Sequence, residues 1–143
     1  AADQGIVKAQ FNLGAMYDKG EGVLKDDKEA VKWYRKAAEQ GNARAQLNLG
    51  LMYDNGEGVL EDDVTAYAWW NIAAANGSKT AKKNKRLLVE EMTREQIAEA
   101  QALSRDLLRQ IEANKAGKPK QPEFPFAAPR LDPRTGLPIN KLK

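Results

Sequence analysis

A repeat with a period of 36 residues constrains this chain more than any other feature of its sequence. The 35 residues that begin at Lys8 align without a gap with the 35 that begin at Arg44, and 20 of the aligned positions are identical. A fixed period of this length is typical of repeat proteins, in which each unit buries its apolar face only against its neighbours. The chain of 143 residues is therefore predicted to fold as a short array of similar units.

Each unit reads as two helices joined by a glycine turn. Apolar residues recur at helical spacing in the first helix of each unit, and we expect this face to be buried: Ala9, Leu13, Met16 and Tyr17, then Ala45, Leu49, Met52 and Tyr53. The GEGV segments at 20–23 and 56–59 interrupt the pattern with glycines that permit a tight reversal. Asp26 or Asp27 then caps the second helix of the first unit, and Asp62 holds the equivalent position in the second unit.

The second helix of each unit carries two adjacent apolar stripes, which predict two packing neighbours. In the first unit the stripes are Ala30, Trp33 and Ala37 beside Val31, Tyr34 and Ala38. A glycine inside each first helix, Gly14 and Gly50, costs about 1 kcal/mol relative to alanine and so indicates a close approach of the two helices. We expect Gly14 to lie opposite Ala30 or a similarly small residue.

The string A-x-x-x-L-G-x-x-Y-x-x-G-x-G-V, followed by D and then by A-x-x-W-[YW]-x-x-A-A-x-x-G, resembles the Sel-one-like repeat family, a variant of the tetratricopeptide repeat. Two complete copies carry it, at 8–43 and 44–79. The resemblance implies an all-α, right-handed superhelical solenoid of antiparallel helix pairs whose first helices line a concave surface. It also implies a protein-binding scaffold or adaptor, of bacterial origin, with the periplasm or cell envelope favoured and the cytoplasm open.

The ends of the chain depart from the repeat. Residues 1–7 are expected to be the end of a preceding unit, because AADQG at 1–5 matches AAEQG at 37–41. Residues 80–113 have lost the motif and are expected to form a degenerate capping helix pair. Residues 114–143 form a basic tail that contains all six prolines, and we expect it to be extended or disordered because it cannot bury enough apolar area.

If the family geometry holds, the solvent-facing positions of the first helices are the candidate partner-binding residues. These are Lys8, Phe11, Ala15, Asp18, Arg44, Leu47, Leu51, Asp54, Lys83 and Leu87. The alternative is that the apolar members, Phe11, Leu47 and Leu51, simply pack against a neighbouring helix.

A run of cations at the start of the third unit offers a different function, the binding of an anion or a nucleic acid. Lys79, Lys82, Lys83 and Arg86 share one helical face. A solvated face on a capping unit is the simpler interpretation. Nucleic acid is disfavoured because no aromatic residues are interleaved with the cations for base stacking.

The tail is more apolar than a spacer requires. Phe124, Phe126 and Leu131 form a candidate docking motif, which could occupy a groove of this chain, of a second copy or of a partner. A plain flexible terminus is the alternative. Residues 1–78 hold 8 Lys/Arg against 12 Asp/Glu and residues 79–143 hold 15 against 8, so attraction between the two parts favours docking within the chain or between copies.

The composition argues against catalysis. The chain has no His and no Cys, which removes imidazole bases, thiolate nucleophiles and the usual zinc sites. An acid-dependent hydrolase would need two carboxylates that face each other from different units. Asp18 with Asp54 is the only repeated pair that could meet this requirement. We therefore expect no enzyme activity, no metal and no cofactor. No apolar run approaches the ~20 residues that a membrane-spanning helix needs.

Overall fold

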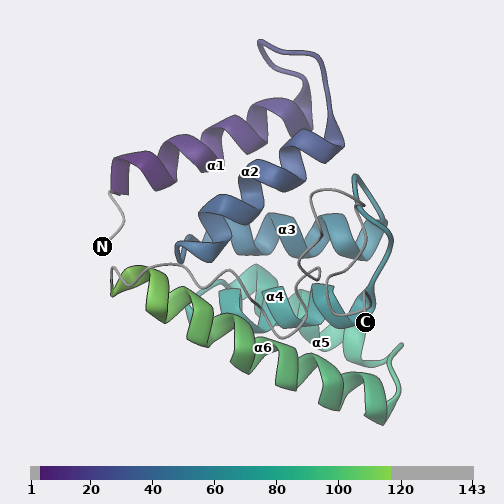
Figure 1. Cartoon of the computed structure of the whole chain (residues 1–143). Helices are drawn as coiled ribbons and strands as arrows, with labels where there is room; N and C mark the ends of the chain where they lie inside the picture. Colours follow the sequence, from purple (N-terminus) through teal and green to yellow (C-terminus); the bar gives the residue numbers. More distant parts are fainter. Residues whose placement is uncertain (1–3, 117–143) are drawn as a thin grey trace, which may run out of the picture.

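Helices α1 to α4 form two antiparallel pairs, one for each copy of the repeat, and two further helices follow (Figure 1). The computed structural model describes residues 4–116, in which every regular element is a helix. The expected all-α solenoid of helix pairs is confirmed. The bounds are α1 Gln4–Lys19, α2 Asp27–Glu39, α3 Ala43–Asn55, α4 Asp63–Ala75, α5 Lys79–Val89 and α6 Arg94–Lys115.

Short polar side chains fix where the helices begin. Asp26 and Asp62 each accept a hydrogen bond from the backbone N–H three residues on, and so cap α2 and α4 as predicted. Thr93 and Gln96 form a reciprocal capping box at the start of α6, with bonds of 3.1 and 2.9 Å. No helix between residues 4 and 116 is long and apolar enough to cross a membrane.

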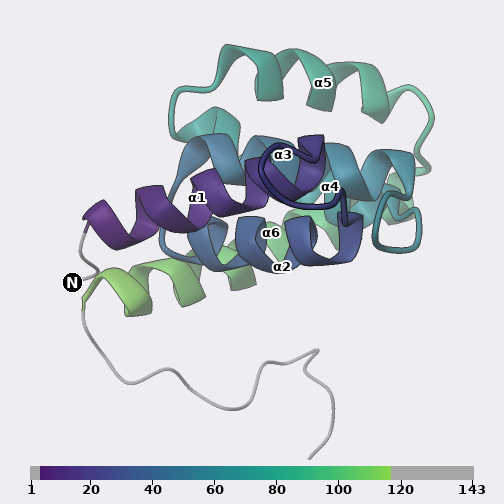
Figure 2. The same cartoon turned by 90° about the horizontal axis from the view of Figure 1, so that it is seen from above.

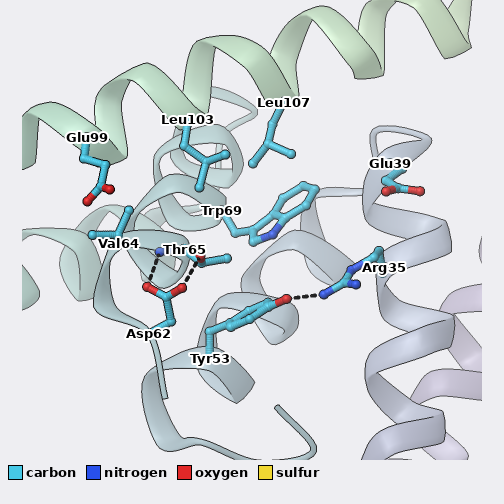
Figure 3. Close-up of a pocket in the computed structure, with 10 residues that line it drawn as sticks. All are labelled: Arg35, Glu39, Tyr53, Asp62, Val64, Thr65, Trp69, Glu99, Leu103 and Leu107. Atoms are coloured by element: carbon cyan, nitrogen blue, oxygen red, sulfur yellow. Dashed lines mark hydrogen bonds between the residues drawn. The ribbon is translucent and has the colours of Figure 1, made fainter. Parts of the chain in front are cut away.

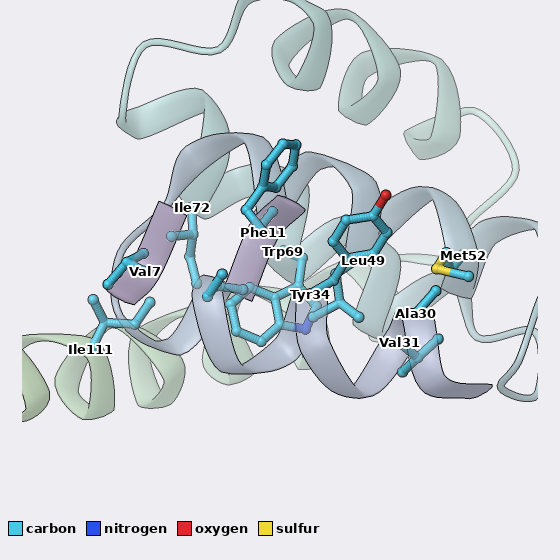
Figure 4. Close-up of a cluster of buried hydrophobic side chains, with 13 residues drawn as sticks. Val7, Phe11, Ala30, Val31, Tyr34, Leu49, Met52, Trp69, Ile72 and Ile111 are labelled. Atoms are coloured by element: carbon cyan, nitrogen blue, oxygen red, sulfur yellow. The ribbon is translucent and has the colours of Figure 1, made fainter. Parts of the chain in front are cut away.

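The buried side chains form two clusters that share α4. The first cluster joins the two repeats to the end of α6, with Tyr34, Leu49 and Trp69 at its centre and Ile111 at its edge (Figure 4). The second joins α4 to α5 and α6 through residues such as Trp70, Leu88 and Ala100. Helix α4 therefore packs against α3, α5 and α6, and it is the element that holds the carboxyl-terminal half together.

Helices α5 and α6 both pack against α4 and make few contacts with each other (Figure 2). The amide of Asn114, near the end of α6, donates to the backbone carbonyl of Glu39 at the end of α2 over 2.8 Å. Helix α6 thus spans from the second repeat back to the first.

The same apolar face has different neighbours in the two first helices. In α3 it is covered by the preceding α2, so Ala45 and Leu49 are fully buried and Met52 is 3% exposed. In α1 the equivalent Met16 is 37% exposed and Leu13 only half-buried. The predicted burial is therefore right for Ala45, Leu49 and Met52 of α3, where Tyr53 is only half-buried. It is wrong for α1, which buries Val7, Phe11 and Gly14 instead, because it packs mainly against α2.

The glycines inside α1 and α3 do mark close approaches, but the groups opposite them are aromatic rings rather than small residues. A Cβ added to Gly14 would lie 2.7 Å from Cδ1 of Tyr34, and one added to Gly50 would lie 2.4 Å from Nε1 of Trp70. The expected partner Ala30 is therefore wrong. Each glycine leaves space for a large ring from the second helix of its own unit.

Candidate protein-binding surface

The candidate partner-binding positions fall at equal register on α1, α3 and α5, and we call this set of positions the first-helix surface. Lys8, Arg44 and Lys83 are exposed, and Leu87 is 54% exposed. Half-buried members of the set are Ala15, Asp18, Leu47, Leu51 and Asp54.

Phe11 does not face solvent as predicted: its side chain is 8% exposed and belongs to the first core cluster. Its ring centroid lies 5.7 Å from that of Tyr34, and the guanidinium of Arg44 lies 4.7 Å from it. The aromatic ring that Gly14 admits provides the contact that buries Phe11. At this position the alternative interpretation, packing against a neighbour, is the correct one.

Tyr34 reaches from α2 to α1 and α3. Its hydroxyl donates to the carboxylate of Asp18 on α1 over 3.1 Å and also hydrogen-bonds the side chain of Asn48 on α3. Burial, followed by the negative charge of Asp18, raises the pKa of the Tyr34 hydroxyl above its usual value of 10. Sequence reasoning placed Tyr34 in a packing stripe and missed this polar role; the available signal was its alignment with Trp70, another ring with a polar atom.

The Tyr34 hydroxyl predicts a loss of stability in alkaline solution. Because the folded chain holds this proton more tightly than the unfolded chain, the stabilisation is complete below pH 10 and falls as the pH rises above it, by up to about 1.4 kcal/mol per pH unit. Tyr34→Phe is expected to be less stable at pH 7 by about 1 kcal/mol, through the lost hydrogen bond, and to have a shallower slope. Urea unfolding of both proteins between pH 8 and 11 measures this, and equal slopes would contradict the assignment.

Trp70 plays the equivalent part in the second unit. Its indole N–H donates to the backbone carbonyl of Leu47 over 3.1 Å, and the ring is 2% exposed. Tyr34 and Trp70 therefore support the first-helix surface from below, each through the space left by a glycine.

The end of the first-helix surface near Asp54 is strongly acidic. Partial burial raises the pKa of the Asp54 carboxyl above its ordinary value, and the nearby carboxylates of Asp63, Glu91 and Glu61 add to the effect. Asp63 is the first residue of α4, Glu61 lies in the turn before α4, and Glu91 lies in the turn between α5 and α6. A basic group from a partner would relieve their mutual repulsion.

Four of the five cations of α5 are exposed to solvent. Lys79, Lys82, Lys83 and Arg86 are exposed, whereas Lys85 turns back to donate to Asn71 over 2.9 Å. Within residues 4–116, His, Cys, Asp and Glu form no group of three or more that could hold a metal ion. Phe124, Phe126 and Leu131 lie outside the described residues.

A groove that the sequence did not indicate lies between α6 and the two repeats, and we call it the α6 groove. It encloses about 610 Å³. Leu103 and Leu107 of α6 point toward Trp69 of α4, and the guanidinium of Arg35 donates to the hydroxyl of Tyr53 at the opposite side (Figure 3). The groove is built from four helices far apart in sequence, so no local pattern could have revealed it.

The arrangement of helices is similar to that of solved repeat proteins. The structure superposes on c5321, a protective antigen of uropathogenic Escherichia coli strains with an SLR fold, with a TM-score of 0.72 and 33% identity over 88% of this chain and 27% of that one. It also superposes on a Sel1 repeat protein from Oxalobacter formigenes, with a TM-score of 0.56 and 44% identity over 57% of this chain and 62% of that one.

Sequence comparison agrees with the structural comparison. A stretch of 38 residues, 27% of this chain and 6% of the relative, is 50% identical to the chitin synthase regulator SKT5 of Saccharomyces cerevisiae. The chain thus spans only a small part of that relative. The Sel1 repeat matches residues 7–42 and again residues 43–78, which together make up half of the chain. The chain therefore belongs to the Sel1 repeat family.

Proposed function

We propose that this chain is a scaffold that binds an extended segment of a protein partner across the first-helix surface. The observation that carries the proposal is a row of accessible apolar side chains at one register: Ala15 on α1, Leu51 on α3 and Leu87 on α5. Ala15 and Leu51 are half-buried and Leu87 is 54% exposed. Apolar side chains at a constant 36-residue spacing suit a ligand that crosses successive helices.

The family supports a protein as the ligand. Sel1 repeat proteins generally mediate protein–protein interaction, and the fold is typically a non-enzymatic scaffold. The side chains on the first-helix surface then determine which partner segment binds.

The charges beside the apolar row specify the chemistry of the partner. Arg44 and Lys83 lie toward the amino-terminal ends of α3 and α5, and the acids around Asp54 lie at the carboxyl-terminal end of α3. A partner segment with acidic residues along one edge, apolar residues in the middle and a basic residue at the other edge complements this pattern. Such complementarity fixes orientation and speeds association more than it adds affinity.

The surface is ordered before the partner arrives. Tyr34 ties α1 to α3, and Trp70 holds the backbone of α3 at Leu47. A preorganised surface loses little conformational entropy on binding, so more of the contact energy remains as affinity.

Replacing the apolar row with charge is expected to weaken binding strongly. Peptides selected from a random displayed library on the full chain provide the probe, and their affinity is measured by calorimetry. Leu51→Glu combined with Leu87→Glu should weaken the selected peptides at least tenfold, because each change places a carboxylate where the peptide buries an apolar group.

The matched control uses two other leucines at equal register. Leu24 and Leu60 are both 90% exposed in the turns that follow α1 and α3, and neither belongs to the first-helix surface. Leu24→Glu with Leu60→Glu should leave the affinity unchanged. Peptides that bind the Leu51 and Leu87 variant as tightly as the wild type, or that are lost in the control, would exclude the first-helix surface as the binding site.

A further inference from the structure

We infer that the α6 groove holds the segment Phe124 to Phe126 of the same chain. The inference does not depend on the partner-binding role of the first-helix surface, because the two surfaces share none of the residues that define them. It rests on the chemistry of the groove, on the point at which the described chain ends, and on charge.

The groove offers apolar walls that are incompletely covered. Leu103 and Leu107 on α6 are half-buried, and they face Trp69 across the hollow (Figure 3). Val64 and Tyr53, also half-buried, extend the apolar lining at the side of the second repeat. Aromatic and aliphatic walls of this kind take proline-rich segments, whose extended form costs little entropy to fix. Phe124 and Phe126 flank Pro125, in a stretch that also holds Pro119 and Pro122.

The described chain ends beside this groove. The amide of Asn114 is bonded to the carbonyl of Glu39, and Glu39 lies on the rim of the groove. From Ala116 back along α6 to Leu103 is about 20 Å at 1.5 Å per residue. The eight residues 117–124 span about 25 Å when extended at roughly 3.1 Å each. A chain that turns back along α6 therefore has enough length to place Phe124 beside Leu103.

The charges are complementary. Glu39, Asp62 and Glu99 are acidic residues on the lining of the groove, where Arg35 is the one cation among the lining residues. Residues 117–143 carry six Lys/Arg against two Asp/Glu. Lys118 and Lys120 precede the phenylalanines and Arg130 follows them, so cations flank the apolar segment on both sides.

Paramagnetic relaxation in the full chain tests the inference directly. The chain contains no cysteine, so Ala128→Cys provides a unique attachment point for a nitroxide. We expect a loss of signal for the amides of Leu103 and Leu107 and for the indole N–H of Trp69. The loss should diminish as salt is added, because the flanking charges are screened.

Paired variants separate the segment from the rest of the tail. In the labelled protein, Phe124→Ser with Phe126→Ser should restore the groove signals. The matched control, Leu137→Ser with Ile139→Ser, removes two apolar residues beyond the segment and should leave the loss intact. Restoration in the control, or no restoration in the phenylalanine variant, would overturn the assignment to Phe124–Phe126.

Mixing isotopes identifies the chain that supplies the segment. Isotope-labelled protein without nitroxide is mixed with unlabelled protein that carries it, so that only contacts between copies cause a loss. We expect the groove signals to be unaffected in this mixture. A loss in the mixture equal to that in the single protein would mean that the segment docks on a second copy. A loss confined to α1 and α3 would mean that it docks on the first-helix surface, and either result overturns the inference.

Discussion

The Gly50→Ala variant is expected to be less stable than the wild-type chain by about 2 kcal/mol, although alanine is the better helix former. The new Cβ would lie 2.4 Å from Nε1 and 2.5 Å from Cδ1 of Trp70, whose ring is 2% exposed and cannot swing away. Overpacking costs about 1–3 kcal/mol, and displacement of the indole from the Leu47 carbonyl costs about 1 more. Alanine returns only about 1 kcal/mol of helix propensity.

The sign of this effect should reverse when the ring is removed. Trp70→Ala alone is expected to cost about 3–5 kcal/mol. In that background Gly50→Ala meets no ring, and it should stabilise the protein by about 1 kcal/mol. Chemical denaturation of the four proteins gives the coupling between the two positions. Additive effects would show that Gly50 serves some purpose other than admitting Trp70.

The Gly58→Ala variant is expected to lose about 3 kcal/mol, whereas Gly22→Ala at the same position of the first repeat should lose about 1. Both glycines have positive φ, +74° and +76°, and a side chain there costs about 1–2 kcal/mol. They differ in their surroundings. A Cβ on Gly58 would lie 2.4 Å from the backbone oxygen of Asp27, whereas one on Gly22 would meet only the terminal methyl of Met16 at 3.3 Å.

The difference between the stability losses of Gly58→Ala and Gly22→Ala measures the contact between the turn after α3 and the start of α2. Asp27 is the first residue of α2, so its carbonyl is held by the helix and cannot move aside as a flexible methionine can. Urea unfolding of the two variants beside the wild type gives the difference. Equal losses would show that backbone strain alone accounts for both glycines, and that the turn after α3 does not brace the preceding unit.

The fold was largely predictable from the sequence because the signals that determine it, helix caps and apolar spacing, are local and recur in each repeat. The positions of helix starts follow from single capping residues such as Asp62 and Thr93, and the buried face of α3 follows from its spacing. The same spacing misplaced the buried face of α1, because burial depends on which helices lie alongside: α3 packs against both α2 and α4, whereas α1 packs mainly against α2. The repeated motif therefore predicts where the helices of a unit begin better than it predicts which helices pack against that unit.

The exposure of the first-helix surface was less predictable, because it too depends on which side chains of other helices lie alongside. Phe11 and Leu47 occupy equivalent positions, yet Phe11 is buried by Tyr34 and Arg44 while Leu47 remains half-buried. The Tyr34 hydroxyl contacts residues 16 and 14 positions away, on two different helices. The α6 groove depends on the angle at which α6 crosses the repeats, which no spacing along the chain encodes.

The uneven packing of α1 and α4 determines which of these two helices opens more easily. Helix α1 has one main neighbour, whereas α4 has three. In a linear array the free energy of local opening grows with the number of interfaces that must break. Release of α1 therefore breaks one main interface, whereas release of α4 breaks three. Local opening is thus expected to cost less free energy at α1 than at α4.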